Sequence, residues 1–157
     1  MLNEELKTKI TELFPAAIFE ESSSLIPVEW PNILITPEHW LALATELRNN
    51  ESLFFDYLFC VTCIDWKTHL TMVYHLTSTR FRHHVVVRAN MDNNKPEIET
   101  VSHIWKTASF HEREAYEMFG VNFLNHDDLR LLILPDGWEG KNPMRKDYED
   151  PINMIRL

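Results

Sequence analysis

The sequence is poor in glycine and cysteine. Its 157 residues include only three glycines, all of them after residue 119. Dinucleotide-binding loops and P-loops need several closely spaced glycines, so that the backbone can approach phosphate groups. Neither loop can be built here, which excludes binding of NAD or ATP by those routes. Two cysteines are too few for a disulfide framework and suit a reducing compartment.

Long apolar runs and a basic surface are missing as well. The longest largely apolar run, residues 57–64, has the length of a strand, whereas a membrane span needs roughly 20 residues. The formal net charge of −9 argues against nucleic acid or anionic lipid as a main partner, because phosphate groups attract basic surfaces. The charged N-terminus lacks the apolar centre of a signal peptide, so we expect a cytoplasmic location.

Two patterns that resemble metal or redox sites fail on their spacing. His111-Glu112 begins like the helix of a zinc protease, but Ala115 stands where the second histidine ligand would be. Cys60 and Cys63 are three residues apart within a predicted strand, so they point to opposite faces of it. We therefore expect core cysteines and no metal site in this chain.

Apolar spacing predicts three helices. Apolar residues recur at helical intervals over 2–14 and again over 38–48. Thr36 followed by Pro37 is typical of a helix start, with a hydroxyl cap before a first-turn proline. Residues 102–119 also have a helical pattern.

Branched and aromatic residues predict the strands between these helices, at residues 17–20, 32–35, 56–66, 69–78 and 82–90. Short links make the last three neighbouring antiparallel strands. The order of elements predicts an α+β fold, a two-layer sandwich of a largely antiparallel or mixed sheet with helices on one face.

The last third of the chain has a different character. Residues 121–157 combine glycine and proline with large apolar residues that follow no sustained period. We predict an α+β core domain over residues 1–120 and an extended irregular C-terminal arm over 121–157. Such a segment cannot readily build its own core, so it either wraps the domain or docks on another protein.

The stretch from Ser109 to Gly120 carries the densest charge in the chain. Ser109 and Glu112 have the spacing of a capping box, which would restart the helix at Ser109. Glu112 falls on the apolar side of a helical wheel, where a carboxylate needs either that cap or a cation. Arg130 and Arg145 are the candidate cations, and Gly120 supplies the C-terminal stop.

The remaining charges of that helix fall on its other side. Arg113, Glu114 and Glu117 would form a solvated outer face, and Arg113 and Glu117 have the spacing of an ion pair. The functional alternative to a solvated face is that these charges contact a partner protein. Downstream, Arg130, Arg145 and Lys146 stand among aspartates, a mixture typical of ion-pair networks; these aspartates are Asp127, Asp128 and Asp147.

Four segments in order, residues 73–78, 111–123, 126–140 and 142–151, carry a resemblance to a known family. The sequence is similar to the 30-kDa-type subunit, also designated the C subunit, of respiratory complex I, the NADH–quinone oxidoreductase. It departs from the family pattern at a few positions: Glu117 replaces aspartate, Asn125 glycine, Asp127 proline, Leu131 arginine and Asn142 histidine.

The resemblance implies a non-catalytic structural subunit, inactive in isolation, in the peripheral arm of a proton-translocating complex. It implies a place on the cytoplasmic side of the inner membrane, against the 49-kDa-type subunit, also designated the D subunit. FMN and the iron–sulfur clusters that carry electrons from NADH to quinone would belong to partner subunits, and this chain would hold no cofactor. The candidate interface or structural ion-pair residues are Glu112, Arg113, Glu114, Glu117, Arg130, Arg145, Lys146 and Asp147.

Two other functions remain open. The first keeps the fold and changes the assembly, to a homologous subunit of a membrane-bound hydrogenase or of a ferredoxin-using complex. The second is a stand-alone metal-dependent enzyme that uses His111, Glu112 and His126.

Overall fold

A computed structural model describes residues 3–19, 30–150 and 152. The predictions for residues 2, 20, 151 and 153–157 lie outside this range. The elements, in chain order, are α1 (Asn3–Leu13), β1 (Ile18–Phe19), β2 (Asn32–Ile35), α2 (Pro37–Asn49), β3 (Tyr57–Asp65), β4 (His69–Thr77), β5 (His84–Asp92), β6 (Glu97–Glu99), α3 (Ala108–Phe119) and β7 (Asn122–Leu124).

The main sheet has five strands in the order β1-β2-β5-β4-β3. The three long strands pair antiparallel through short turns, as their sequence predicts. β2 joins β5 in parallel, and β1 pairs antiparallel with β2, so the sheet is mixed. The remaining strands, β6 and β7, form a small parallel sheet.

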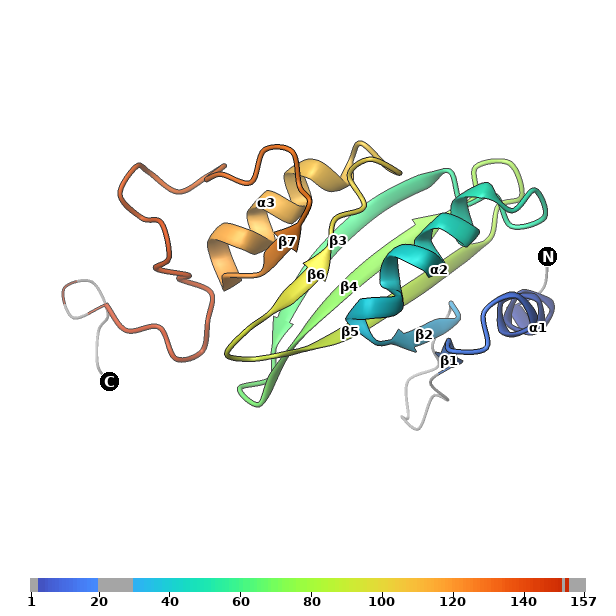
Figure 1. The fold of residues 1–157 in the computed structure, drawn as a ribbon, viewed down its shortest axis with the longest axis horizontal. Coiled ribbons are helices and arrows are strands. Elements are labelled where there is room, and N and C mark those ends of the chain that lie inside the picture. The colour runs from blue at the N-terminus through green and yellow to red at the C-terminus, as the bar shows by residue number, and fades with distance from the viewer. Residues whose placement is uncertain (1–2, 20–29, 151, 153–157) are drawn as a thin grey trace.

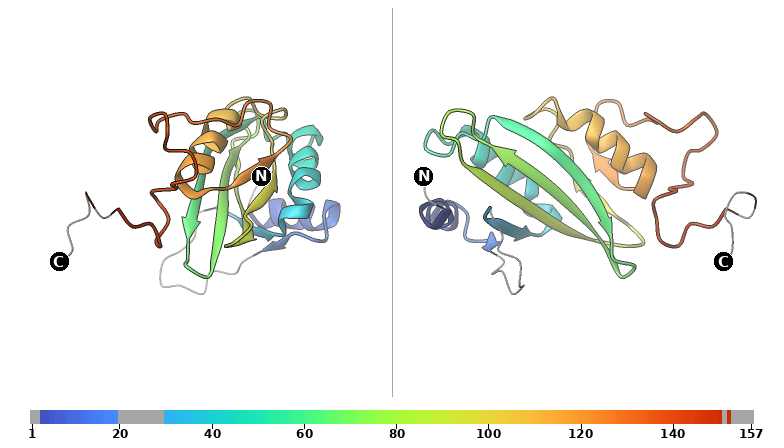
Figure 2. Two further views of the ribbon diagram at one scale, coloured as in Figure 1. Left: turned by 60° about the vertical axis from the view of Figure 1, so that its left-hand side comes forward. Right: turned by 180° about the vertical axis from the view of Figure 1, so that it is seen from behind.

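Both central helices cover one face of the main sheet. Figure 1 shows α2 in front of the long strands and α3 next to β3, and the view from behind shows the sheet in front of α2 (Figure 2). This arrangement confirms the two-layer α+β prediction. The core lies between the layers, where Trp40 of α2 stacks on Tyr74 of β4 at 4.2 Å between ring centroids. Both side chains are fully buried.

The helix starts differ in detail from the predicted caps. Thr36 precedes Pro37 at the start of α2, as predicted, but its hydroxyl pairs with the ring of His39 at 2.9 Å rather than with a backbone N–H. The predicted helix over 102–119 is shorter, because residues 102–107 form turns before α3 begins. Gly120 ends α3 with a φ of 78°, the left-handed conformation that glycine adopts most readily.

The chain beyond α3 begins inside the core and then leaves it. Val121 and Phe123 belong to the core cluster. From residue 125 to 150 the chain has no helix or strand, and it passes around α3 before turning away from the domain (Figure 1). The division into a core of residues 1–120 and an arm of 121–157 stays a prediction.

Candidate partner-docking site

Glu117 of α3 binds the arm. Its side chain is buried, and its two carboxylate oxygens accept hydrogen bonds from three consecutive backbone N–H groups. These come from Leu132 at 2.8 Å, Ile133 at 3.0 and 3.1 Å, and Leu134 at 3.2 Å. Hydrogen bonds to an ionised acceptor are roughly twice as strong as neutral ones, so this carboxylate fixes the path of the arm.

Arg113 binds the two arm residues that precede Leu132, namely Arg130 and Leu131. Its Nε donates to the carbonyl of Arg130 at 3.1 Å, and its Nη2 donates to the carbonyl of Leu131 at 2.7 Å. Its Nη1 also lies 3.9 Å from Asp128 Oδ2. The prediction of a solvated Arg113–Glu117 pair is wrong, because the arm covers both side chains and each binds the arm backbone.

Glu112 is fully buried at the opposite side of α3. The hydroxyl of Thr100 and the backbone N–H of Val101, at 2.9 Å, donate to its carboxylate. Burial raises the pKa of Glu112 to about 7, against the lowering effect of these two hydrogen bonds. The nearest ring nitrogen is Nε2 of His126, 3.7 Å from Oε2 of Glu112.

The predicted capping box is therefore wrong. α3 begins one residue before Ser109, with Thr107 at its cap position and no side-chain hydrogen bond there. Ser109 Oγ instead lies 3.5 Å from His126 Nε2. The carboxylate of Glu112 instead accepts hydrogen bonds from the loop between β6 and α3, which begins at Thr100. The two predicted cations pair elsewhere, Arg130 with Asp128 and Arg145 with Asp147.

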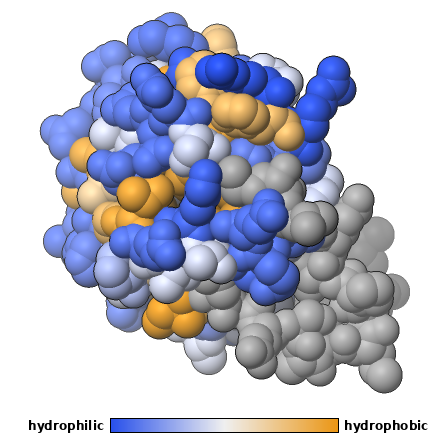
Figure 3. Space-filling view, turned by 90° about the vertical axis from the view of Figure 1, so that its right-hand side faces the viewer, coloured by the Kyte–Doolittle hydropathy of each residue, from blue (hydrophilic) through white to orange (hydrophobic). Residues whose placement is uncertain are grey.

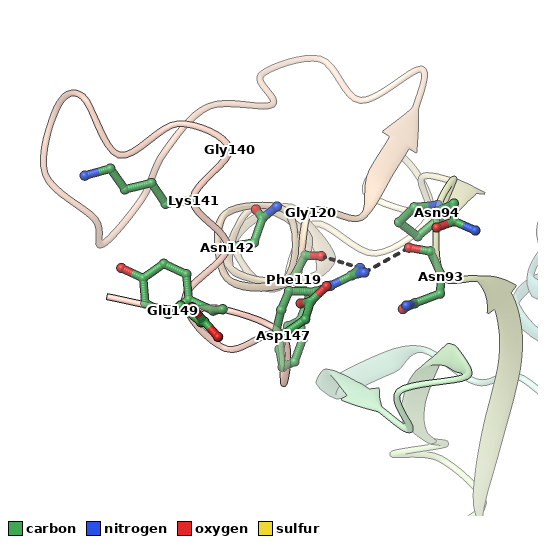
Figure 4. A pocket seen from close by; sticks show the side chains of 12 residues that line it. Asn93, Asn94, Phe119, Gly120, Gly140, Lys141, Asn142, Asp147 and Glu149 are labelled. Carbon is green, nitrogen blue, oxygen red and sulfur yellow. Dashed lines mark hydrogen bonds and ion pairs between the residues drawn. The ribbon is translucent and has the colours of Figure 1, made fainter. Parts of the chain in front are cut away.

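Arg145 attaches the far part of the arm (Figure 4). Its Nη1 donates to the carbonyl of Phe119 at 3.3 Å and its Nη2 to the carbonyl of Asn93 at 2.9 Å, which joins the arm to α3 and to the turn after β5. Its Nε lies 3.5 Å from Oδ1 of exposed Asp147. These groups form one wall of an open cavity of about 510 Å³ between the arm, Gly120 and that turn.

Asp65 makes a second attachment, which the sequence did not reveal. Its Oδ2 accepts the backbone N–H of Lys146 at 2.8 Å, and its Oδ1 accepts that of Lys67 at 2.6 Å. Burial would raise the pKa of Asp65, but these backbone hydrogen bonds and the nearby charges of Arg145 and Lys146 lower it. An aspartate at the end of a strand, before a turn, is common in sequences. Its bond to Lys146, 81 residues away, therefore has no signal in the sequence.

The other predicted residues stay at the surface. Glu114 is exposed, as predicted for the outer face of α3. Arg130 is also exposed, and its Nε forms an ion pair with Asp128 at 3.0 Å. Lys146 is exposed and is held through its backbone. A role at a subunit interface stays a prediction for all eight candidate residues.

Large apolar side chains are exposed at this end of the molecule. On the arm, Leu132 is 37% exposed, Ile133 62% and Met144 58%, and Phe110 on α3 is 61% exposed. At the end of the molecule that faces away from the arm, hydrophilic residues predominate, with hydrophobic residues between them (Figure 3). These exposed apolar groups are candidates for a protein–protein contact.

The described residues contain no group of three His, Cys, Asp or Glu side chains placed to hold a metal ion, although Glu112 and His126 are close together. Within the same part of the chain, every helix is too short or too polar to cross a membrane.

A family model described as the respiratory-chain NADH dehydrogenase 30-kDa subunit matches residues 33–151. The chain belongs to this family. The matched range contains α3 and all of the arm attachments described above. It begins within β2 and therefore leaves out α1 and β1.

Curated relatives of this 30-kDa-type chain agree with that assignment. It is 42% identical over 113 residues to the C/D subunit of NADH-quinone oxidoreductase from Phocaeicola vulgatus, which covers 71% of this chain and 22% of the relative. It is 39% identical over 112 residues to the C subunit of the same enzyme from Chloroherpeton thalassium, covering 70% and 46%. It is also 42% identical over 102 residues to the C subunit of F(420)H(2) dehydrogenase from Methanosarcina mazei, covering 62% and 63%. The chain thus spans less than two thirds of each of these relatives.

Two solved structures share the fold. A chain of the membrane-bound sulfane sulfur reductase, an archaeal respiratory membrane complex, superposes with a TM-score of 0.79 at 24% identity, over 93% of this chain and 85% of that one. The trypsin-resistant fragment (1–134) of Nqo5 superposes with a TM-score of 0.65 at 22% identity, over 80% and 98%.

One departure from the family pattern has a direct structural explanation. Asn125, where the 30-kDa-type family has glycine, adopts a φ of 61°. Asparagine tolerates this left-handed conformation better than most residues. Its side-chain amide donates to both carboxylate oxygens of Glu99, at 3.1 and 2.9 Å, and so ties the start of the arm to β6.

Proposed function

We propose that this chain is a non-catalytic structural subunit of the peripheral arm of a proton-translocating NADH–quinone oxidoreductase. Electron transfer from NADH through FMN and iron–sulfur clusters to quinone would then be the task of other subunits, and this chain would hold no cofactor. Family membership supports the assembly. The observation that carries the structural role is the use of the two buried charges Arg113 and Glu117, which bind the arm backbone.

The proposed main partner is the 49-kDa-type subunit, the D subunit of such complexes, on the cytoplasmic side of the inner membrane. The relative from Phocaeicola vulgatus is named as a combined C/D subunit, and this chain matches only 22% of its length. A protein that joins both subunits in one polypeptide keeps them close together. The exposed apolar groups of the arm offer a surface for such a contact.

The test is affinity purification of the tagged full-length chain from native membranes. We expect the 49-kDa-type subunit and the flavin- and NADH-binding subunits to co-purify, with NADH:quinone activity in the complex and none in the chain expressed alone. NADH oxidation by the isolated chain would contradict the structural role. Recovery of the chain without any of these subunits would contradict the assembly.

A related respiratory complex is the second candidate. The F(420)H(2) dehydrogenase relative and the structural similarity to a chain of the sulfane sulfur reductase both favour it, because they show that the fold occurs in other complexes. The same purification distinguishes the two. Co-purification of hydrogenase-type or ferredoxin-using subunits, in place of NADH- and flavin-binding ones, would support this second assembly.

A further inference from the structure

Residues 130–134, here named the anchor segment, are attached to α3 by hydrogen bonds to their backbone. The carbonyl groups of Arg130 and Leu131 accept from Arg113, and the next three N–H groups donate to Glu117. The two α3 residues are four apart and so lie on one face of the helix. The Arg113 guanidinium thus binds two consecutive carbonyl groups of the arm, and the Glu117 carboxylate binds the three N–H groups that follow them.

This attachment leaves two of the four apolar side chains of the anchor segment exposed to the solvent, while Leu131 and Leu134 are half-buried. Its backbone polar groups face α3, while Ile133 remains 62% exposed and Leu132 37% exposed. No helix or strand of the described chain covers them. Exposure of large aliphatic side chains to water is unfavourable. Burial of Leu132 and Ile133 against another protein surface would therefore lower the free energy.

The polar attachment also lowers the entropy that binding would cost. A free loop must be ordered when it binds, and each immobilised residue reduces the affinity. Arg113 is only 8% exposed and Glu117 2% exposed, so their bonds to the anchor segment are shielded from water and salt. The segment is therefore already in one conformation before any partner arrives.

We propose that the anchor segment is a pre-shaped apolar contact that inserts Ile133 and Leu132 into an apolar pocket of the 49-kDa-type subunit. This inference rests on the proposed function and specifies which part of the chain makes the contact. The partner follows from the C/D relative, in which the portion that matches this chain shares one polypeptide with a D portion. Arg113 and Glu117 act as positioning residues, since they shape the segment and remain beneath it.

The chain offers a closely matched pair of positions for the test. Ile133 is 62% exposed on the anchor segment, and Ile18 is 64% exposed on β1, in the part of the chain that the family model does not match. Each variant, Ile133→Asp or Ile18→Asp, is purified and titrated with the purified 49-kDa-type subunit, and the dissociation constant is measured. We expect Ile133→Asp to weaken binding at least about tenfold, the loss that follows when one buried aliphatic contact is removed. Ile18→Asp should bind as the wild type does.

A second variant tests the attachment itself. Glu117→Gln keeps the shape of the side chain but removes its charge and one acceptor, while three N–H groups need partners. Hydrogen exchange at residues 132–134 of the free chain should become faster, and binding should weaken although Ile133 is unchanged. Should this variant fail to fold, the comparison of Ile133→Asp with Ile18→Asp still decides the proposal.

The outcomes separate this inference from the proposed function. If the wild-type chain binds the 49-kDa-type subunit and Ile133→Asp binds equally well, the anchor segment is not the contact and the inference fails alone. If the wild-type chain does not bind that subunit, the proposed partnership fails and the inference with it. If sedimentation shows a wild-type dimer that Ile133→Asp dissociates, the segment binds a second copy, which also overturns the inference.

Discussion

Glu112 Oε2 lies 3.7 Å from Nε2 of His126, and this contact joins the buried side of α3 to the first residues of the arm. Both side chains are almost completely enclosed. The carboxyl of Glu112 has a pKa of about 7 because burial disfavours its charged form, and the Thr100 hydroxyl and Val101 N–H only partly offset this. A proton at this position is therefore coupled to folding.

The first prediction concerns pH. Because the folded pKa of Glu112 lies above its usual value of 4.5, the folded state binds more protons than the unfolded state between pH 4.5 and about 7. The contribution of Glu112 to the free energy of unfolding is thus complete below pH 4.5 and is lost as the pH rises to about 7. The full loss corresponds to about 3 kcal/mol.

Denaturant unfolding of the wild type and of Glu112→Gln across pH 4.5–8 measures this effect. The stability of Glu112→Gln relative to the wild type should increase with pH over that window. Glu114→Gln serves as the control. Glu114 is exposed on the same helix, so its substitution should leave the dependence of stability on pH unchanged. Parallel profiles for the wild type and Glu112→Gln would contradict the prediction.

The second prediction concerns the two cysteines. Burial, with the nearby Asp65 carboxylate, raises the pKa of the Cys63 thiol to about 12, and only the thiolate is a good nucleophile. Cys63 is 6% exposed, whereas Cys60 is half-buried on the other side of the β3 strand. We expect iodoacetamide at pH 8 to leave Cys63 unmodified in the folded chain.

Mass spectrometry of Cys60→Ser after alkylation gives a direct readout of Cys63. In the folded variant the modified fraction should be close to zero over an hour, and in denaturant it should approach completion. Rapid modification of the folded protein would show that β3 opens far more often than a core strand should.

Local periodicity predicts much of this fold. Trp40, Leu43 and Leu47 are on the buried face of α2 as their spacing indicates, and the three long strands pair as their short links require. Those elements depend on residues that are close in the sequence. The same reasoning failed for α3, where a helical wheel assigned Arg113 and Glu117 to the solvent.

The helical wheel failed at α3 because the residues that cover Arg113 and Glu117 are distant from them in the sequence. The groups that enclose Glu117 come from positions 15 to 17 residues later, in a segment with no periodic pattern of its own. A charge on a polar helix face and a charge beneath an irregular segment look alike in sequence. Backbone partners also carry no side-chain signature, so the contacts of Arg113 and Asp65 with the arm could not be predicted either.

The third prediction concerns the glycine that ends α3. Gly120 has a φ of 78°, and a Cβ added there would lie 2.6 Å from Nδ2 of Asn142. Gly120→Ala therefore combines backbone strain of roughly 1–2 kcal/mol with displacement of the Asn142 side chain. Gly137 has a φ of 85° with nothing within 4 Å, so Gly137→Ala imposes the strain alone.

Thermal unfolding should rank Gly120→Ala as the more destabilising of the two. Asn142→Gly removes the clashing amide, so Gly120→Ala should be less harmful in that background than in the wild type. An equal effect in both backgrounds would mean that Asn142 does not limit the space at Gly120.

The last prediction concerns Arg145, which donates to the carbonyls of Phe119 and Asn93 and so attaches the far part of the arm to two elements of the core. Arg145→Ala removes two charge-assisted hydrogen bonds, each worth about 1.5–3 kcal/mol, and should loosen residues 142–150, which Asp65 still holds at Lys146, while the core stays folded. Faster hydrogen exchange in that range, with an unchanged melting temperature for the core, is the expected result. Recovery of the 49-kDa-type subunit in a pull-down should also fall.

Arg130→Ala is the matched control for that experiment. Arg130 is a second arginine of the arm, but its side chain is 72% exposed and pairs only with Asp128 in the described structure. An exposed ion pair of this kind contributes about 0–1 kcal/mol, so exchange at residues 142–150 should stay as in the wild type. Equal release of the arm by both variants would show that net charge, rather than the two carbonyl contacts of Arg145, holds it in place.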